Sequence, residues 1–438
     1  MPASLPQPSL SRWQFRTALS LFVGYSAYYL CRSNLAVVAP LLLREFAGQG
    51  LNKEVLGQIA SLGVLCYAAG KVVNGVLGDF LGGKRIFLLG MVGAVVATVA
   101  FGLGQGVAVF FGAWALNRLV QSMGWAGLVK ITANWFAYHT YGRIMGLLSL
   151  SYLFGDIVAK LALGQLLAWG VGWRGVFMTA AAVLAAVALA SWVSLRNTPE
   201  SVGLTPPPPR PDNLFASPDV TADRPASLGQ LLRPYLRSES FRLLLLMSFG
   251  LTGLREAFSF WVPTYLVESA HLTESAASQF SALYSFFGML SILGAGYLSD
   301  GWLRGQRGSL ILGACVLLVP VLLLMMQPAG GALSLLYISL MGLLLLGPYS
   351  FLAGAMALDA GGRQGVATAA GLIDAVGYTG STVALWLTGT LAERHGWGAA
   401  FLALALLALA TAGAALVFCR TQERTPAREL VTSYTRAK

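Results

Sequence analysis

The stretch Gly75-Val-Leu-Gly-Asp79, followed by Lys84-Arg85, recurs 221 residues later as Gly296-Tyr-Leu-Ser-Asp300, followed by Arg304 and Arg307. Two further pairs repeat at almost the same offset, namely Gly172-Trp173 with Gly396-Trp397 and Gly142-Arg143 with Gly362-Arg363. Similarity at half the chain length predicts two halves built to the same plan.

Long apolar runs surround each copy of this repeat. Of the 438 residues, 56% are hydrophobic and only 11% are charged, and the mean hydropathy is +0.68. Soluble domains carry about 25% charged residues, so this composition excludes a soluble enzyme of two or three domains. One membrane-spanning helix needs about 20 apolar residues, so the chain is long enough for twelve.

The sequence therefore predicts an all-α membrane protein with twelve transmembrane helices in two pseudo-symmetric six-helix bundles. We expect an N-terminal bundle in 1–196, a cytoplasmic linker with the motif TPPPPRP in 197–238, a C-terminal bundle in 239–419 and a tail in 420–438. The predicted spans are 13–38, 53–77, 84–104, 107–136, 142–168, 174–195, 240–267, 275–298, 308–328, 332–356, 363–391 and 396–419.

Basic residues set the orientation of these spans. Of the 29 Lys and Arg, nineteen fall on one side, four on the other and six within spans. Cations accumulate in cytoplasmic loops, so both termini are predicted to be cytoplasmic. The same rule explains the net charge of +11 without a nucleic-acid partner. The four Cys form no CxxC or Cys/His motif, so we expect neither a disulfide framework nor a zinc site.

Ionisable residues inside the spans are the strongest functional signal, because each costs roughly 2.5–3.5 kcal/mol at the bilayer centre. The cations there are Arg32, Lys71, Arg118, Lys130, Lys160 and Arg255, and the acids are Asp156, Glu256 and Asp374. Six cations against three acids predict that an anion, such as a phosphate ester, completes the site. No GxxxxGK[ST] motif is present, which argues against an ATP-driven pump.

Arg32 and Arg255 are the foremost candidates for binding that anion. They lie in the first and seventh spans, which are equivalent in the two predicted halves, so the two side chains are expected to face each other across the pseudo-twofold axis. Arg binds phosphate oxygens bidentately and does not deprotonate. The alternative is that each Arg pairs with a neighbouring acid or carbonyl.

Several polar and aromatic residues are expected near these two cations. Tyr25 and Tyr29 precede Arg32 on one face of its helix, and Tyr67 and Lys71 are four residues apart in the second span. Phenol hydroxyls suit ester and sugar oxygens, although packing is an equally good explanation for any single Tyr. We expect Arg118 in the fourth span to be structural, whereas Gln121 and Trp125, which follow it, are candidates to line the cavity.

Two acids have a possible partner four residues later. Asp156 and Lys160 stand in the order that favours an ion pair on a helix, which either neutralises itself or opens when substrate arrives. Asp374 shares a face of the eleventh span with Tyr378, and the roles of these two residues stay open.

The chain resembles the organophosphate:phosphate antiporter family of the major facilitator superfamily. The resemblance rests on Tyr-Ser-Ala-Tyr-Tyr-Leu-Cys-Arg-Ser-Asn (25–34), on Lys71, on Gln121-Ser-Met-Gly-Trp125 and on Arg255 before Trp261-x-Pro-Thr-Tyr. The repeated Gly-xxx-Asp and basic loop resembles the superfamily's cytoplasmic loop signature, which is structural.

The resemblance implies that Arg32 and Arg255 bind the phosphate group, that Lys71 assists them, and that Tyr25, Tyr29 and Tyr67 line the pathway. Tyr152 stands where the glycerol-3-phosphate branch of the family has a His, so glycerol 3-phosphate itself is in doubt as the substrate.

The resemblance also implies exchange of a phosphate ester for inorganic phosphate by alternating access, with no bond chemistry and no cofactor. We expect a monomer in a lipid bilayer, with the bacterial inner membrane as the default location. Two alternatives stay open: a proton-coupled solute transporter, in which an in-span acid titrates, and a receptor that binds hexose phosphate without transporting it.

Overall fold

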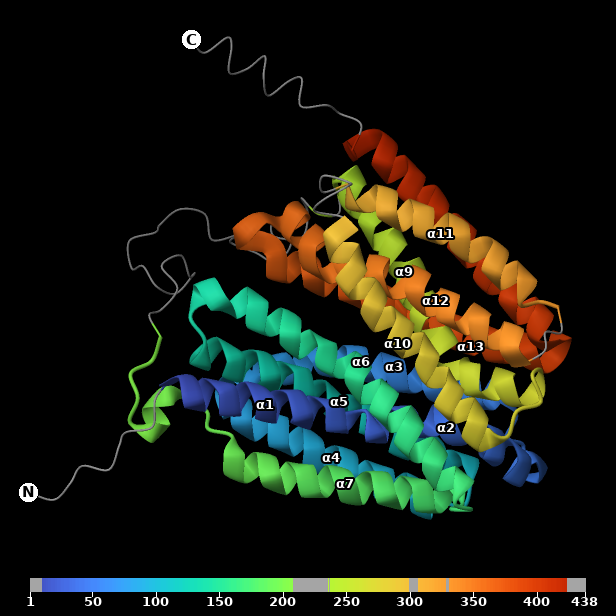
Figure 1. Ribbon diagram of the computed structural model, residues 1–438, viewed down its shortest axis with the longest axis horizontal. Helices are drawn as coiled ribbons and strands as arrows, with labels where there is room; N and C mark the ends of the chain where they lie inside the picture. Colours follow the sequence, from blue (N-terminus) through green and yellow to red (C-terminus); the bar gives the residue numbers. More distant parts are fainter. Residues whose placement is uncertain (1–9, 208–234, 236, 299–305, 328–330, 424–438) are drawn as a thin grey trace, which may run out of the picture. The chain divides into compact units, whose positions relative to one another are not determined.

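A computed structural model describes residues 10–207, 235, 237–298, 306–327 and 331–423, and these residues contain helices and no strands. They divide into two compact units (Figure 1). Unit 1 consists of Met1–Asp223 and Leu272–Ala282, and unit 2 of Arg224–His271 and Leu283–Lys438. The linker beyond residue 207, the tail beyond 423, Asp300 and Arg304 lie outside the described residues, as do the side chains of Asp79 and Arg363.

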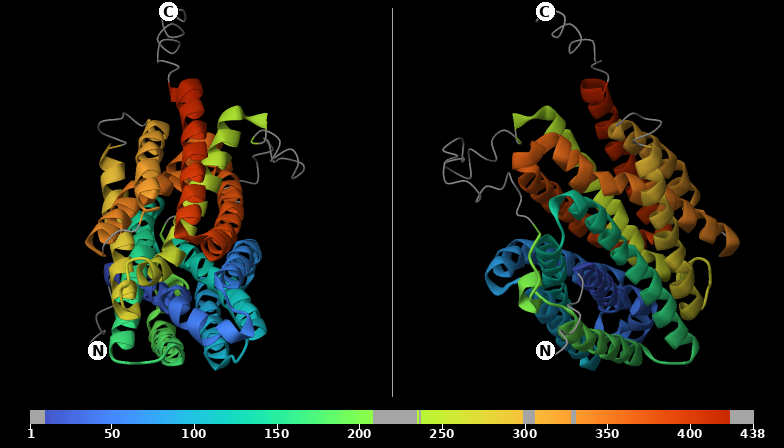
Figure 2. Two further views of the ribbon diagram at one scale, coloured as in Figure 1. Left: turned by 90° about the vertical axis from the view of Figure 1, so that its right-hand side faces the viewer. Right: turned by 60° about the vertical axis from the view of Figure 1, so that its left-hand side comes forward.

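Unit 1 holds seven consecutive long helices. They are α1 (Leu10–Tyr28), α2 (Leu30–Glu45), α3 (Lys53–Leu81), α4 (Gly83–Leu103), α5 (Val107–Trp135), α6 (Tyr138–Ala168) and α7 (Trp173–Ser194). Short 3-10 helices, η1 (Ala47–Gln49) and η2 (Pro199–Val202), follow α2 and α7. Within the unit α5 packs against α3 and α4, and α4 also packs against α7. Figure 2 shows these helices from two further sides.

Unit 2 contains fewer but longer helical runs. They are α9 (Glu239–Glu268), α10 (Glu274–Tyr297), α11 (Arg307–Leu324), α12 (Gly331–Phe351) and α13 (Ala357–Phe418). The first residues of α10 belong to unit 1. One π-turn, η4 (Leu352–Met356), joins α12 to α13, and another, η5 (Cys419–Glu423), follows α13. Within unit 2, α13 packs against α9 and α11.

The first predicted span is interrupted at Tyr29. The residues before it form α1 and those after it form α2, and the Tyr29 amide donates to the Ser26 carbonyl at 3.0 Å, one residue short of the α-helical partner. Apolar periodicity does not reveal such a break, because the helices on both sides continue the same pattern. The interruption lies three residues before Arg32.

The last two predicted spans both lie in α13, which has 62 residues. A straight helix of this length would extend about 93 Å, three times the thickness of the hydrocarbon core. Gly396 has φ +80°, a left-handed conformation that glycine adopts without a Cβ clash. The orange and red parts of α13 run in different directions in Figure 1. This glycine lies at the predicted boundary between the two spans.

Nine helices of the described residues are long and apolar enough to cross a membrane. The predicted first and fourth spans are not among them, since the first is divided and α5 carries Asn117, Arg118 and Gln121 in its middle. The last two predicted spans count as one because α13 includes both of them, on either side of Gly396. The protein is therefore a multi-pass, all-α membrane protein, while the number twelve stays a prediction.

The internal repeat has a direct structural counterpart in each unit. In unit 1 the Trp173 indole donates a hydrogen bond to a Glu45 carboxylate oxygen at 2.7 Å, and its ring packs edge-on against Phe177. In unit 2 the Trp397 indole donates to Glu268 at 2.8 Å and packs against Phe401. In each unit a tryptophan at an equivalent position thus joins the last helical segment to the end of the first predicted span of that unit.

Candidate functional site

Tyr67 is the centre of a group of cations inside unit 1. The guanidinium carbon of Arg32 lies 4.4 Å from the centre of its ring, that of Arg118 lies 5.0 Å away, and the Lys71 ammonium lies 5.7 Å away. Tyr67 itself is buried. The negative face of an aromatic ring attracts cations, and the attraction strengthens away from water. One phenol ring therefore helps to hold three positive charges near one point.

Three helices supply this cation group, which we define as Arg32, Lys71 and Arg118 around Tyr67. Arg32 comes from α2, Tyr67 and Lys71 from α3, and Arg118 from α5. Gly63, one turn before Tyr67, permits the approach of α5, because a Cβ there would lie 2.9 Å from the Arg118 side chain. The expected neighbours Tyr67 and Lys71 are confirmed. No pattern in the sequence near Arg118 indicates that its side chain joins this group.

A row of aromatic rings continues from the cation group along α1. The Tyr29 ring lies 5.2 Å from the Arg32 guanidinium and 6.4 Å from the ring of Tyr152 on α6. Tyr25 packs against Tyr29 at 6.1 Å and against Trp125 of α5 at 5.5 Å. The structure thus brings together four of the aromatic residues predicted from the sequence, and Arg32 joins them to Tyr67. Tyr25 is buried, whereas Tyr29, Trp125 and Tyr152 keep part of their surface exposed.

Asp156 and Lys160 form the predicted ion pair within α6. The Lys160 ammonium lies 2.8 Å from one Asp156 oxygen, and the Ser33 hydroxyl on α2 donates to the other at 2.5 Å. The Lys160 side chain is 1% exposed and that of Asp156 is 9% exposed. The pair therefore does more than neutralise α6, since it also links α6 to the helix that carries Arg32.

Gln121 occupies a different setting from the expected cavity wall. It is buried and donates a hydrogen bond to the Cys31 carbonyl at 3.0 Å, and it also bonds to Asn117. Asn117 in turn donates to the Thr98 hydroxyl at 2.9 Å. This chain of polar groups joins α2, α5 and α4. Gln121 thus holds the backbone next to Arg32 in place, a role that its position in the sequence does not reveal.

In unit 2 the corresponding cation has different neighbours. The Arg255 guanidinium forms an ion pair with Glu256 and lies 4.5 Å from the centre of the Tyr349 ring. The two charged side chains are 14% and 16% exposed. Tyr349 on α12 was not a candidate in the sequence, because only the tertiary structure brings α12 to α9. Tyr378 is buried on α13, one turn after Asp374.

The cation group is an arrangement that can hold an anion. Ten of the twelve candidate side chains lie in unit 1, on or beside α1, α2, α3, α5 and α6, together with Arg118, while Arg255 and Tyr378 lie in unit 2. In the described part of the chain, no three His, Cys, Asp or Glu side chains gather as metal ligands.

Comparison with known proteins supports this picture. Residues 21–378 match the Major Facilitator Superfamily. A probable hexose phosphate transport protein of Chlamydia pneumoniae is 26% identical over 90% of this chain and 88% of its own length. The glycerol-3-phosphate transporter of Bacillus subtilis is 26% identical over 90% and 89%. The membrane sensor protein UhpC of Salmonella typhimurium is 24% identical over 94% and 92%.

A solved structure agrees in fold. The inward-facing, unoccupied form of a bacterial homolog of the human lysosomal transporter Spinster superimposes with a TM-score of 0.74. The alignment covers 93% of this chain and 97% of that one at 16% identity, which bears on the fold alone. The chain belongs to the major facilitator superfamily, and its relatives are consistent with the organophosphate:phosphate antiporter family within it.

Proposed function

We propose that this protein transports organic phosphate esters across a membrane. The observation that carries the proposal is the cation group around Tyr67, in which Arg32, Lys71 and Arg118 gather inside the membrane-spanning part of unit 1. Three cations held so close together repel one another in a low-dielectric interior. A dianionic ligand relieves this repulsion. The printed names of the relatives, which include hexose phosphate and glycerol-3-phosphate transporters, favour a phosphate ester as that ligand.

In this proposal Arg32 and Arg255 bind the phosphate group, one from each unit. Each guanidinium offers a planar pair of donors to phosphate oxygens. Lys71 adds a third positive charge, and Tyr25, Tyr29, Tyr67, Trp125, Tyr152 and Tyr378 line the pathway for the organic part of the ester. Asp156 and Lys160 hold α6 to α2 and keep Arg32 in position.

We further propose that the ester is exchanged for inorganic phosphate by alternating access of two six-helix bundles. The vacant site resists closure because its cations repel, and either phosphate species removes that resistance. Both termini are placed in the cytoplasm by the bias of basic residues, and the bacterial inner membrane is the proposed location.

Counterflow in proteoliposomes tests this function. Vesicles loaded with inorganic phosphate are expected to accumulate labelled hexose 6-phosphate or another ester from a panel, and empty vesicles are not. Arg32→Lys and Arg255→Lys should each lower the exchange rate by about 100-fold, since each loses a bidentate charge-assisted bond of about 3 kcal/mol. Arg143→Lys, at an exposed position in the second turn of α6, is the matched control. Undiminished exchange in either variant would remove the two-arginine site.

A second candidate is a sensor that binds the ester without transporting it. The similarity to UhpC, which is described as a membrane sensor protein, specifically favours it. Saturable binding of hexose phosphate to the purified protein, without counterflow for any ester, supports this alternative. A proton-coupled transporter would differ from both, because a pH gradient would drive its uptake with no phosphate inside the vesicles.

A further inference from the structure

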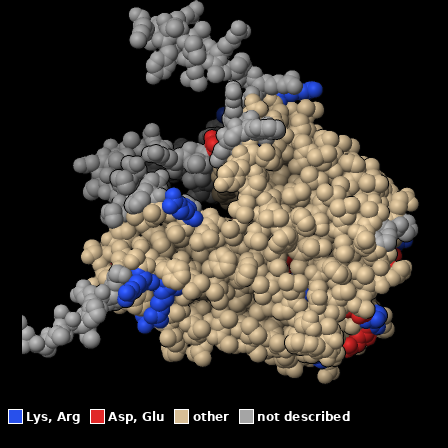
Figure 3. Space-filling view, viewed as in Figure 1, with Lys and Arg blue, Asp and Glu red and all other residues tan. Residues whose placement is uncertain are grey.

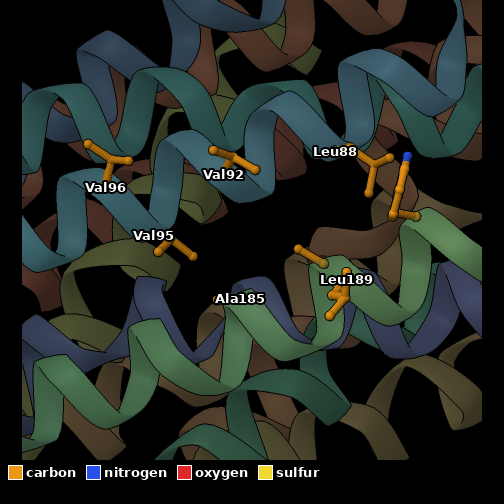
Figure 4. A pocket seen from close by; sticks show the side chains of 8 residues that line it. Leu88, Val92, Val95, Val96, Ala185 and Leu189 are labelled. Carbon is orange, nitrogen blue, oxygen red and sulfur yellow. The ribbon is translucent and has the colours of Figure 1, made fainter.

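An apolar groove runs along the outside of unit 1 between α4 and α7, away from the cation group. Its volume is about 480 Å³, within the range of ligand pockets, and Figure 4 shows the side chains that line it. They are Leu88, Val92, Val95, Val96, Ala185, Ala188, Leu189 and Trp192. Val92, Leu189 and Trp192 are 55%, 61% and 60% exposed, so the groove opens toward the bilayer.

Three cations gather at the end of this groove. The Lys84 ammonium donates to the Trp192 carbonyl at 2.7 Å, and Lys84 lies one turn before the groove residue Leu88. Arg196 donates to the carbonyls of Val193 and Leu195 at 3.0 and 3.1 Å, and Arg16 of α1 also reaches Val193. In Figure 3 Lys and Arg side chains appear in several separate places, while most of the surface carries no charge.

We propose that this groove binds an anionic phospholipid of the cytoplasmic leaflet. One acyl chain lies along the groove, and the phosphate of the head group lies near Arg16, Lys84 and Arg196. Basic clusters between transmembrane helices on the cytoplasmic side recognise acidic lipid head groups. This site is separate from the transport site, and it stands whether or not the proposed function does.

The dimensions of the groove fit one leaflet. Along α4, the distance from Lys84 to Val96 is about 18 Å at the helical rise per residue. Half of a hydrocarbon core of about 30 Å is about 15 Å, so the groove is long enough for a chain anchored at Lys84 to reach the middle of the bilayer. The predicted orientation places Lys84 on the cytoplasmic side, where anionic lipids attract basic residues.

Capping of α7 explains only part of the cation cluster. Cations near the last carbonyls of a helix are stabilised by the helix dipole, and many helices have one such cation at this end. Here three cations from α1, α4 and the segment after α7 meet at the same turn, where their mutual repulsion opposes the capping. A lipid phosphate offsets this repulsion, and the groove supplies the adjacent place for its chain.

Native mass spectrometry of the full-length protein tests the proposal with phosphatidylglycerol and phosphatidylcholine of identical acyl chains. Phosphatidylglycerol is expected to bind about 100-fold more tightly, at about 1 kcal/mol for each of the three basic residues. The double variant Arg16→Gln/Arg196→Gln should weaken phosphatidylglycerol binding about thirtyfold, at about 1 kcal/mol for each basic residue, and leave phosphatidylcholine unchanged. Arg143→Gln removes one positive charge on the same predicted side and should have no effect.

A groove-filling variant tests the acyl-chain part without touching the cations. Ala185→Phe places a ring on the exposed side of α7, inside the groove, and should reduce the binding of both lipids at least tenfold. Ala190→Phe, on another exposed face of the same helix, is the matched control. Equal affinity for the two lipids in the unmodified protein, full phosphatidylglycerol binding by the double variant, or unchanged binding by Ala185→Phe would each overturn the proposal.

Discussion

Units 1 and 2 share a framework but differ in the electrostatics of their interiors. Both join a tryptophan to a glutamate at equivalent places, Trp173 to Glu45 and Trp397 to Glu268, at 2.7 and 2.8 Å. Unit 1 then gathers a cation group around Tyr67. Unit 2 has Arg255 beside its own carboxylate, Glu256.

This difference indicates how a repeated fold acquires an asymmetric site. The shared tryptophan–glutamate contacts lie at helix ends, where both halves pack equivalent helices against each other. The interior charges are free to diverge, because each half needs only to stay stable in the membrane. In the proposed function unit 1 would therefore supply most of the positive charge for the anion, while the charge of Arg255 in unit 2 is offset by Glu256.

The largest effect is expected from the buried ion pair of unit 1. Asp156→Ala or Lys160→Ala leaves one charge buried and should lower the free energy of unfolding by about 3–5 kcal/mol. The double variant Asp156→Ala/Lys160→Ala should recover more than half of that loss, because it leaves no unpaired charge. Thermal unfolding in detergent ranks the three variants.

The matched change in unit 2 is Glu256→Gln. It should lower the free energy of unfolding by less than half as much as Asp156→Ala or Lys160→Ala does. The Arg255 and Glu256 side chains remain 14% and 16% exposed, and Arg255 keeps its contact with Tyr349. An equal loss of stability in the two units would contradict the electrostatic difference between them.

A smaller effect is expected from the aromatic partners of the arginines. Tyr67→Leu removes a ring that attracts three cations and should raise the half-saturating concentration of phosphate ester in counterflow about tenfold, whereas Tyr67→Phe keeps the ring and should change it less than threefold. Tyr349→Leu removes a ring that contacts only one cation, and it should raise the half-saturating concentration of phosphate ester about threefold. A similar response to Tyr67→Leu and Tyr67→Phe would show that the hydroxyl, not the ring, is the important part.

The smallest effect is expected from the shared framework. Trp173→Phe and Trp397→Phe each lose one hydrogen bond to a carboxylate and should each lower the free energy of unfolding by about 1 kcal/mol, because the Glu45 side chain is 44% exposed and water replaces part of the bond. The two losses should agree within about 0.5 kcal/mol. Thermal unfolding of both variants checks this equality, and a clear inequality would mean that the repeat is conserved in sequence but not in energetics.

Local patterns were sufficient for contacts that lie within one helix or one repeat. The i, i+4 spacing predicted the Asp156–Lys160 pair, and the same spacing predicted that Tyr67 and Lys71 lie together. Spacing could not predict that Ser33 binds Asp156 or that Tyr349 faces Arg255, since these partners come from other helices. Gln121 was a candidate to line the cavity, whereas in the folded chain its amide donates to the Cys31 carbonyl.

The sequence by itself determined that the chain enters the membrane, that its two halves repeat and that cations outnumber acids inside the spans. These properties follow from composition and spacing, which do not depend on how helices pack. Only the tertiary structure decided that Tyr67 stands among three cations and that α1 ends at Tyr28 before α2 begins. The physical reason is that charge–ring contacts and helix breaks depend on side chains from neighbouring helices. Residue spacing along the chain does not identify those neighbours.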